Sequence, residues 1–312
     1  MDAKSLALTV LGKTLQSRGY RFIAVTPATH CRVLDRAPQT TTLESIFGWN
    51  RPFDREDLDP GILDLLEDAG VLEKESGRYK SKVRFATIGD LIFAHTGFPT
   101  VEHDAVFFGP DTYRFVRLLR ACLADVAPSV PIRLVDVGSG SGAGGIAAAR
   151  WLCTQGNQTE VVLGDINRKA IAFSAVNAVI NDVPASKAVF SDVLAGIEGA
   201  ADIIVANPPY LVDDERRLYR HGGGELGLSL AVRIVEESLD RLKPRGRLVL
   251  YSGTPIIGGG DPLFEALRPV LQLNASHFSY GEIDPDVFGE ELDRDAYANA
   301  DRIAAIGLTA IK

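Results

Sequence analysis

The tetrapeptide Asn207-Pro208-Pro209-Tyr210 follows an apolar run at residues 203–206 and carries groups that can hold a planar nitrogen. The side-chain carbonyl of Asn207 and the backbone carbonyl of Pro208 can accept both hydrogens of a flat –NH2 group. Tyr210 adds an aromatic face for stacking. Two such acceptors aim the nitrogen lone pair at an electrophile and favour the positive charge that grows during attack. The tetrapeptide indicates group transfer to a weakly nucleophilic nitrogen; the alternative is a rigid turn after a strand.

A glycine-rich turn lies earlier in the chain, where residues 136–145 read DVGSGSGAGG. It follows a predicted buried strand and opens a predicted helix, the order required for a ligand-binding turn. Gly138, Gly140 and Gly142 let the backbone turn sharply and approach a ligand closely. Asp136 ends the strand, where its carboxylate can meet a cationic ligand. A glycine-rich connection without a ligand is the alternative.

Two further acids end predicted strands, and the glycine pattern also fits an alternative ligand, a dinucleotide. Asp165 could bind both hydroxyls of a ribose or cap the next helix. Asp192 could accept from an adenine amino group or serve as a turn residue. Gly140, Gly142 and Gly145 also fit G-x-G-x-x-G, and Asp165 follows about 20 residues later, as in the dinucleotide fingerprint. A nicotinamide-dependent dehydrogenase is therefore a competing hypothesis, although it gives the tetrapeptide no role.

The elements that must position these residues alternate between strand and helix from residue 131 onward. We expect strands at 133–137, 160–163, 188–190, 203–206, 247–252, 277–280 and 302–309, and helices at 145–153, 168–180, 228–242 and 262–271. Repeated strand–helix units predict an α/β fold with a mostly parallel sheet covered on both faces. Such sheets bind ligands beyond the carboxyl ends of their strands.

Residues 1–100 follow a different pattern. Leucines at helical spacing near residues 8–15 and helix signals at 42–47 and 60–68 precede two predicted strands, at 71–74 and 79–85. Helices followed by a two-stranded wing predict a winged helix. The third predicted helix is acidic and carries no base, so we favour a dimerisation or lid domain over DNA binding.

Composition narrows the function classes. The 312 residues are 46% hydrophobic and carry a formal net charge of −8, which disfavours a nucleic-acid partner. No apolar run reaches the roughly 18–20 residues of a membrane helix, and no secretory signal is visible. Cys31, Cys122 and Cys153 lie far apart, so we expect neither a zinc site nor disulfides, and a cytoplasmic location fits.

These motifs resemble the class I S-adenosylmethionine-dependent methyltransferases of the Asn-Pro-Pro-Tyr group, over about residues 104–312. That group includes protein-glutamine amide methyltransferases and amino-methyltransferases of adenine or guanine. The resemblance implies a doubly wound Rossmann-like sheet with an antiparallel last strand, S-adenosylmethionine as cofactor and no metal. It implies catalytic roles for Asn207, Pro208 and Tyr210. The residues that it implies for cofactor binding are Asp136, Gly138, Gly140, Gly142, Asp165, Ile166, Asp192, Val193 and Asn207.

Three more segments bear on this resemblance. Residues 107–112 look like the family's element before the first strand, or form a helix start capped by Asp111 or Thr112. Residues 223–228 resemble the family's loop beside the substrate, or form a surface loop. Residues 213–221 mix acids with arginines and show no family signature, so we expect a solvated loop.

The sequence thus predicts a winged-helix-like domain at 1–100 and a methyltransferase domain at 101–312. We expect methyl transfer to a protein glutamine amide or a small-molecule amine. The alternatives are a nucleobase amino-methyltransferase, a nicotinamide-dependent dehydrogenase, and a regulator whose winged helix binds DNA. No membrane partner is expected, and the oligomeric state, a homodimer included, stays open.

Overall fold

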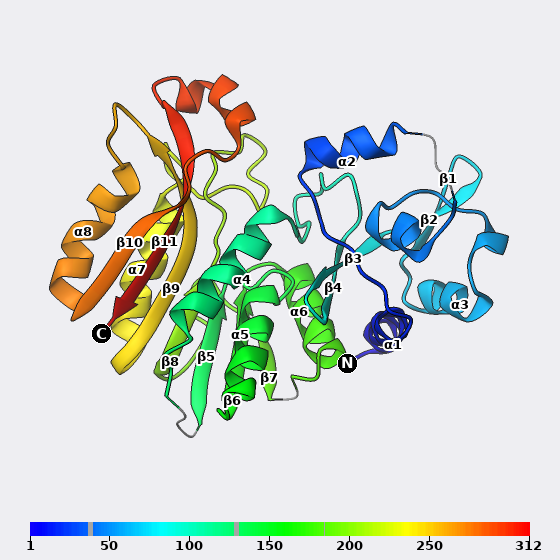
Figure 1. The fold of residues 1–312 in the computed structure, drawn as a ribbon, viewed down its shortest axis with the longest axis horizontal. Helices are drawn as coiled ribbons and strands as arrows, with labels where there is room; N and C mark the ends of the chain where they lie inside the picture. Colours follow the sequence, from blue (N-terminus) through cyan, green and yellow to red (C-terminus); the bar gives the residue numbers. More distant parts are fainter. Residues whose placement is uncertain (37–39, 128–130, 184) are drawn as a thin grey trace.

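The computed structural model describes residues 1–36, 40–127, 131–183 and 185–312. Its central sheet has seven strands in the order β10-β11-β9-β8-β5-β6-β7 (Figure 1). They are β5 (Ile132–Val137), β6 (Thr159–Asp165), β7 (Ser186–Phe190), β8 (Ala201–Ala206), β9 (Leu242–Ile256), β10 (His277–Asp284) and β11 (Arg302–Ile311). In the sheet, β7, β6, β5, β8 and β9 each pair in parallel with the next, whereas β11 runs antiparallel to β9 and β10. The predicted α/β fold, with an antiparallel last strand, is confirmed.

Helices cover both faces of this sheet (Figure 1). Helices α4 (Pro110–Cys122), α5 (Ala143–Thr154) and α6 (Arg168–Ile180) share one hydrophobic cluster with inward residues such as Leu134. Helices α7 (Ser229–Arg241) and α8 (Pro262–Asn274) share a second cluster with Val135. Neighbouring residues of a strand point to opposite faces, so the apolar run of β5 can serve both layers.

Residues 1–100 form helices and two hairpins beside α6. The helices are α1 (Ala3–Ser17), α2 (Pro27–Leu34) and α3 (Pro60–Asp68), and the hairpins pair β1 (Leu72–Glu75) with β2 (Arg78–Ser81) and β3 (Val83–Ile88) with β4 (Leu91–Thr96). The helix predicted at 60–68 is present with these bounds, because Asp59 accepts from the backbone N–H groups of Gly61 and Ile62. The winged-helix assignment stays a prediction.

Two expectations for this part were wrong. The single strand predicted at 79–85 is divided between β2 and β3. The Ser81 hydroxyl donates to the Val83 carbonyl and accepts from the Val83 N–H, and this local side-chain pairing interrupts the strand. The helix predicted at 42–47 is a short π-helical turn, Glu44–Gly48. Helix α2 and strand β4 were not predicted.

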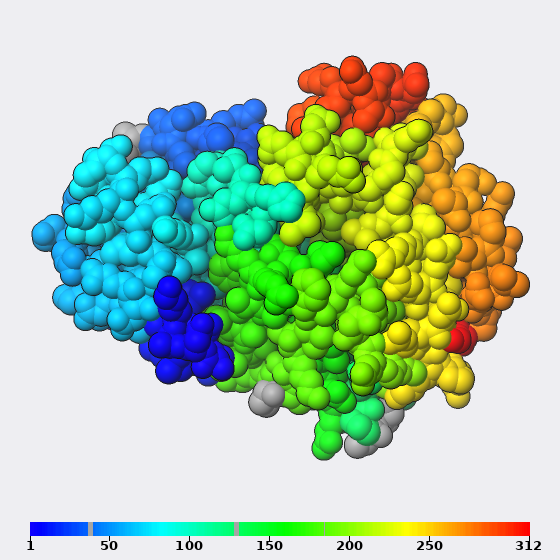
Figure 2. Space-filling model, turned by 180° about the vertical axis from the view of Figure 1, so that it is seen from behind, coloured from blue at the N-terminus to red at the C-terminus, as the bar shows by residue number. Residues whose placement is uncertain are grey.

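The hydrophobic core runs without a break from the N-terminal part into the sheet. Leu11, Ile62 and Phe85 belong to the same cluster as Ile146 and Ile180. Figure 2 shows residues 1–100, in blue and cyan, joined to the flank of the green central part. None of the helices in the described part of the chain has the length and apolarity that a membrane crossing needs.

Candidate active site

A cavity opens at the carboxyl ends of β5, β6 and β8. Every predicted site residue except Gly142 lines it, because parallel neighbours bring their strand ends to one edge. The glycine turn and Asp165 line one part. The tetrapeptide lines another, together with Leu218, Tyr219, Phe288 and Glu290.

The glycine turn takes the conformation that its sequence predicts. Gly138, Gly140 and Gly142 have φ values of +69°, +54° and +78°, which glycine adopts without strain. A Cβ atom placed on Gly138 or Gly140 would meet nothing within 4 Å, so the cavity reaches the bare backbone there. Ser139 Oγ is buried and has no hydrogen-bond partner among the described residues. A bound ligand could therefore approach this turn closely and satisfy the Ser139 hydroxyl.

Asp136 is a buried carboxylate at the end of β5. Its side chain accepts from the Gly145 N–H at 2.7 Å, and only 2% of the residue is exposed. Burial raises the pKa of Asp136 to about 7, and the negative charge of nearby Asp165 adds to the rise. A cation bound in the cavity would stabilise the ionised form, because no basic side chain in the described chain pairs with Asp136.

Asp165, at the end of β6, connects two segments of the cavity wall. Its two oxygens accept from the backbone N–H groups of Gly140 and Asn167, each at 2.8 Å. Burial raises the pKa of this carboxyl group too. The N-cap of α6 is Asn167, which accepts from the Lys169 N–H, so Asp165 does not cap this helix. Both oxygens still have lone pairs that can accept ribose hydroxyls.

Asp192 and Val193 follow β7 on the cavity wall. Asp192 is exposed, and its carboxylate forms an ion pair with Arg233 of α7 at 2.9 Å. Val193 has a φ of +49°, a strained conformation for a β-branched residue and one that clusters at functional sites. Ile166 lines the cavity with 47% of its surface exposed, an apolar area on which a flat ring can pack.

Asn207 is half-buried at the end of β8, and Pro208 behind it is buried. The Asn207 side chain makes no hydrogen bond to any residue that the structure describes. Its amide oxygen is therefore free to accept from a ligand.

The side chain of Tyr210 is fixed by a hydrogen bond and by ring packing. Its hydroxyl donates to Asp111 at 2.9 Å, and the Tyr251 hydroxyl donates to the other oxygen of the same carboxylate at 2.7 Å. The Tyr210 ring packs edge-on against Phe288, with centroids 5.8 Å apart. Burial raises the pKa of Asp111 and of Tyr210. Asp111 therefore fixes the tyrosine; the N-cap of α4 is Gly109, so Asp111 does not cap that helix.

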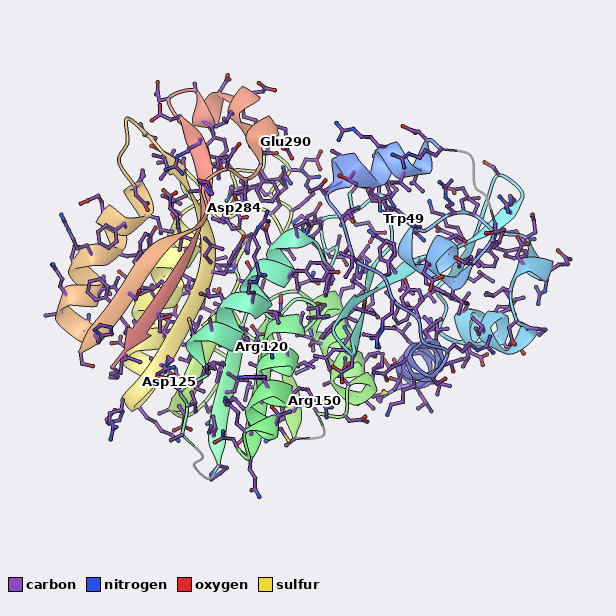
Figure 3. All side chains as sticks on the ribbon, viewed as in Figure 1. Trp49, Arg120, Asp125, Arg150, Asp284 and Glu290 are labelled. Carbon is purple, nitrogen blue, oxygen red and sulfur yellow. The ribbon has the colours of Figure 1, made fainter. Side chains whose placement is uncertain are left out.

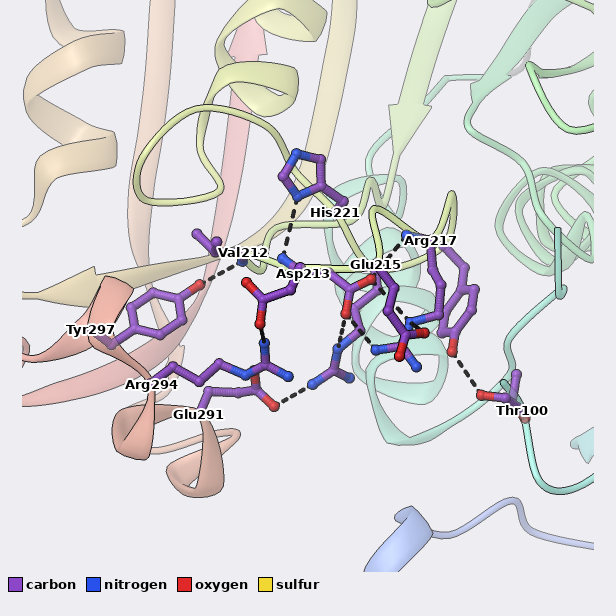
Figure 4. Close-up of polar contacts among 12 residues, drawn as sticks. Thr100, Val212, Asp213, Glu215, Arg217, His221, Glu291, Arg294 and Tyr297 are labelled. Atoms are coloured by element: carbon purple, nitrogen blue, oxygen red, sulfur yellow. Dashed lines mark hydrogen bonds and ion pairs between the residues drawn. The ribbon is translucent and has the colours of Figure 1, made fainter. Parts of the chain in front are cut away.

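Residues 213–221, predicted to be a solvated loop, form a loop with residues 214–216 exposed, but Asp213 is buried in an ion network (Figure 4). Asp213 is 1% exposed and pairs with Arg217 and Arg220. Arg220 also pairs with Glu291, which lies between β10 and β11. Hydrogen bonding from Arg217 lowers the pKa of Asp213 to about 2. Neighbouring acids and arginines can form ion pairs with one another when packed, which the composition of the segment does not reveal.

Sequence reasoning missed several lining residues. Phe288 and Glu290 come from the segment between β10 and β11, Pro27 begins α2, and Tyr219 stacks on Phe107 with centroids 6.0 Å apart. In Figure 3, Glu290 lies at the end of its segment nearest α2. These residues lie far apart in the chain, and no short motif links them to the cavity.

The chain is similar to known methyltransferases. Residues 116–254 match the family model described as methyltransferase small domain. Human Methyltransferase HEMK2 is 32% identical over 151 residues, 46% of this chain and 68% of that protein. This chain belongs to the S-adenosylmethionine-dependent methyltransferases.

Two bacterial relatives of this methyltransferase carry different names. The release factor glutamine methyltransferase of Deinococcus radiodurans is 33% identical over 143 residues, 43% of this chain and 50% of that protein. The ribosomal RNA small subunit methyltransferase C of Chromohalobacter salexigens is 32% identical over 164 residues, 51% of this chain and 43% of that protein. The chain therefore spans half or less of the length of these two relatives.

The residues present in this methyltransferase fit S-adenosylmethionine. The bare backbone at Gly138 and Gly140 and the unpartnered Ser139 hydroxyl leave room and a polar contact. Asp136 and Asp165 are buried acids without a basic partner in the described chain, which suits a ligand that carries positive charge and a ribose.

We expect Gly253→Ala to destabilise this methyltransferase through the tyrosine of the tetrapeptide. A Cβ at this position would lie 2.2 Å from Tyr210 Cε2, so the ring must move. Such overpacking costs about 1–3 kcal/mol. The control is Gly281→Ala in β10, where a Cβ would meet nothing within 4 Å. Urea unfolding that gives the two variants equal stability would contradict the placement of the ring.

We expect Asp136→Asn to be more stable than wild type, by an amount that grows as the pH rises. The unfolded carboxyl ionises near 3.8, whereas the folded one stays protonated up to about 7, so wild-type stability falls between these values. Each pKa unit corresponds to about 1.4 kcal/mol. The free energy of unfolding of the variant minus that of wild type should grow from pH 4 to pH 7 and then level off. If denaturant titration gives a difference that does not change with pH, the raised pKa of Asp136 is contradicted.

Proposed function

We propose that this chain transfers a methyl group from S-adenosylmethionine to a planar nitrogen held by Asn207 and the Pro208 carbonyl. The observation that carries the proposal is the unpartnered Asn207 side chain, which lines the same cavity as the buried carboxylate of Asp136. The cofactor, when bound, supplies a methyl group on positively charged sulfur. Asp136 and Asp165 favour that charge and the ribose hydroxyls. The glycine turn offers backbone contact along one wall.

Asn207 and Pro208 provide the positioning that a poor nucleophile needs. Their carbonyl groups accept the hydrogens of an –NH2 group, which turns the nitrogen lone pair toward the methyl donor. Their partial negative charges stabilise the positive charge that develops on nitrogen. The hydrogen bond from Tyr210 to Asp111 keeps the tetrapeptide rigid while the acceptor enters. In this proposal the surrounding residues need to exclude water and align groups rather than supply a strong base.

For the acceptor we favour a protein glutamine amide or a small-molecule amine over a nucleobase. The net charge of −8 supports this choice, because phosphate groups would be repelled. Glu290 supports it locally: this exposed carboxylate lines the cavity and has no ion-pair partner among the described residues. The relatives named above divide between protein and RNA methylation by their names, so the acceptor must be tested directly.

A nicotinamide cofactor fits less well. Its pyrophosphate would lie on the glycine turn, beside two buried acids that no basic side chain of the described chain neutralises. Such an arrangement repels phosphate rather than binding it. We also propose that residues 1–100, which share the hydrophobic core of the sheet, border the acceptor side of the cavity; the place of Pro27 on the cavity wall supports this.

Two measurements test the proposal. Isothermal titration should detect binding of S-adenosylhomocysteine and none of the nicotinamide dinucleotide; the reverse result would overturn it. Tritium-labelled S-adenosylmethionine is then incubated with the protein and with cell extract treated with either protease or ribonuclease. If ribonuclease treatment removes the label, the acceptor is RNA, and the proposed protein or small-molecule acceptor is wrong.

We expect Asn207→Ala to lower methyl transfer by about 100-fold or more, because one preorganised acceptor is lost. The affinity for S-adenosylhomocysteine should stay nearly unchanged, since the cofactor's main contacts are proposed to lie on the glycine turn and the strand-end acids. The control is Asn274→Ala, at the exposed end of α8, where the side chain bonds only within its own helix. Loss of cofactor binding in Asn207→Ala would show that the residue serves the cofactor instead.

A further inference from the structure

One buried amide links the N-terminal hairpin to the glycine turn. Asn177, on α6, has no exposed surface. Its oxygen accepts from the Ala94 N–H at 2.8 Å, and its nitrogen donates to the Ala94 carbonyl at 2.9 Å and to the Ser141 carbonyl at 2.8 Å. Ala94 lies in β4, whereas Ser141 lies in the glycine turn and lines the cavity. Both amide hydrogens and the oxygen are thereby used.

A second asparagine, one helical turn later, provides an internal comparison. Asn181 accepts from the Ile92 N–H at 3.0 Å and donates to the Ile92 carbonyl at 2.8 Å. Its remaining bond, at 2.9 Å, goes to the Asn177 carbonyl of its own helix. The two asparagines therefore bind the free edge of β4 in the same way. Only Asn177 extends that contact to the glycine turn.

The glycine turn needs such a restraint on this side. Ser141 is flanked by Gly140 and Gly142, which both have positive φ and wide backbone freedom. Bonds to the carbonyl of Gly164 and to Asp165 secure the start of the turn, from the side of β6. Asn177 secures Ser141 from the side of α6 and β4.

We propose that Asn177 is a positioning residue for the cofactor: it fixes the glycine turn and makes cofactor affinity depend on the docked hairpin. The cofactor part of this inference rests on the proposed function. The effect on the turn does not, and it can be measured without ligand.

The first test compares Asn177→Ala with Asn181→Ala. Each variant removes both bonds to β4, so both should lose thermal stability. In ligand-free protein, hydrogen exchange should speed up in residues 138–145 for Asn177→Ala alone, while residues 91–96 exchange faster in both. Equal exchange of the turn in the two variants would reduce Asn177 to a structural role and overturn the proposal. Should alanine at 177 fail to fold, Asn177→Ser and Asn181→Ser replace the pair, because serine is small and uncharged and its hydroxyl can donate and accept.

The second test measures binding of S-adenosylhomocysteine by calorimetry below the unfolding transitions. We expect Asn177→Ala to weaken affinity at least about tenfold, as for the loss of roughly 1.4 kcal/mol. Asn181→Ala should stay within about twofold of wild type. Equal weakening, or none, would overturn the coupling. Absence of binding to wild type would contradict the proposed function, and hydrogen exchange of the turn would still decide the role of Asn177.

Discussion

The burial of Asp136 constrains the rest of this structure. A carboxylate inside the protein is tolerated only when hydrogen bonds or a positive charge compensate for the lost water. The fold supplies one backbone donor, from Gly145, and the pKa of Asp136 still rises to about 7. Protonation avoids the cost of burying the charge, and a positively charged ligand would compensate for the ionised form. The glycine turn, the ends of three parallel strands and residues 285–301, between β10 and β11, together line the space where a ligand would lie.

The tetrapeptide depends on a different kind of restraint. Its side chains must keep their positions while the side facing the acceptor stays open, so the contacts that fix them are made on the opposite side. Asp111 accepts two tyrosine hydroxyls and also pairs with Arg114, which reaches Asp284 at the end of β10. Helix α4, the end of β8, strand β9 and the end of β10 thereby share one polar cluster. A shift in any of them would move Tyr210.

The sequence reveals the features that local chemistry dictates. The helices at 60–68 and 168–180 could be predicted with their observed bounds, because a capping side chain stands directly before each of them. The cavity residues at strand ends follow from the rule for parallel sheets. Contacts between distant segments could not be predicted. Neither the bond from Asn177 to Ser141 nor the pair of Arg220 and Glu291 leaves a local pattern, since each partner alone resembles an ordinary polar residue.

The N-terminal part is more than an attached unit in this arrangement. Its hydrophobic cluster is continuous with that of α5 and α6, and a Cβ at Gly12 of α1 would lie 2.3 Å from Ile180 Cδ1. Two buried asparagines replace a neighbouring strand along β4, so separating the hairpin from α6 would leave backbone groups without partners. Pro27 brings the same part of the chain to the cavity wall. Residues 1–100 therefore reach the glycine turn through Asn177 of α6, which bonds to both Ala94 and Ser141, and they border the cavity through Pro27 of α2.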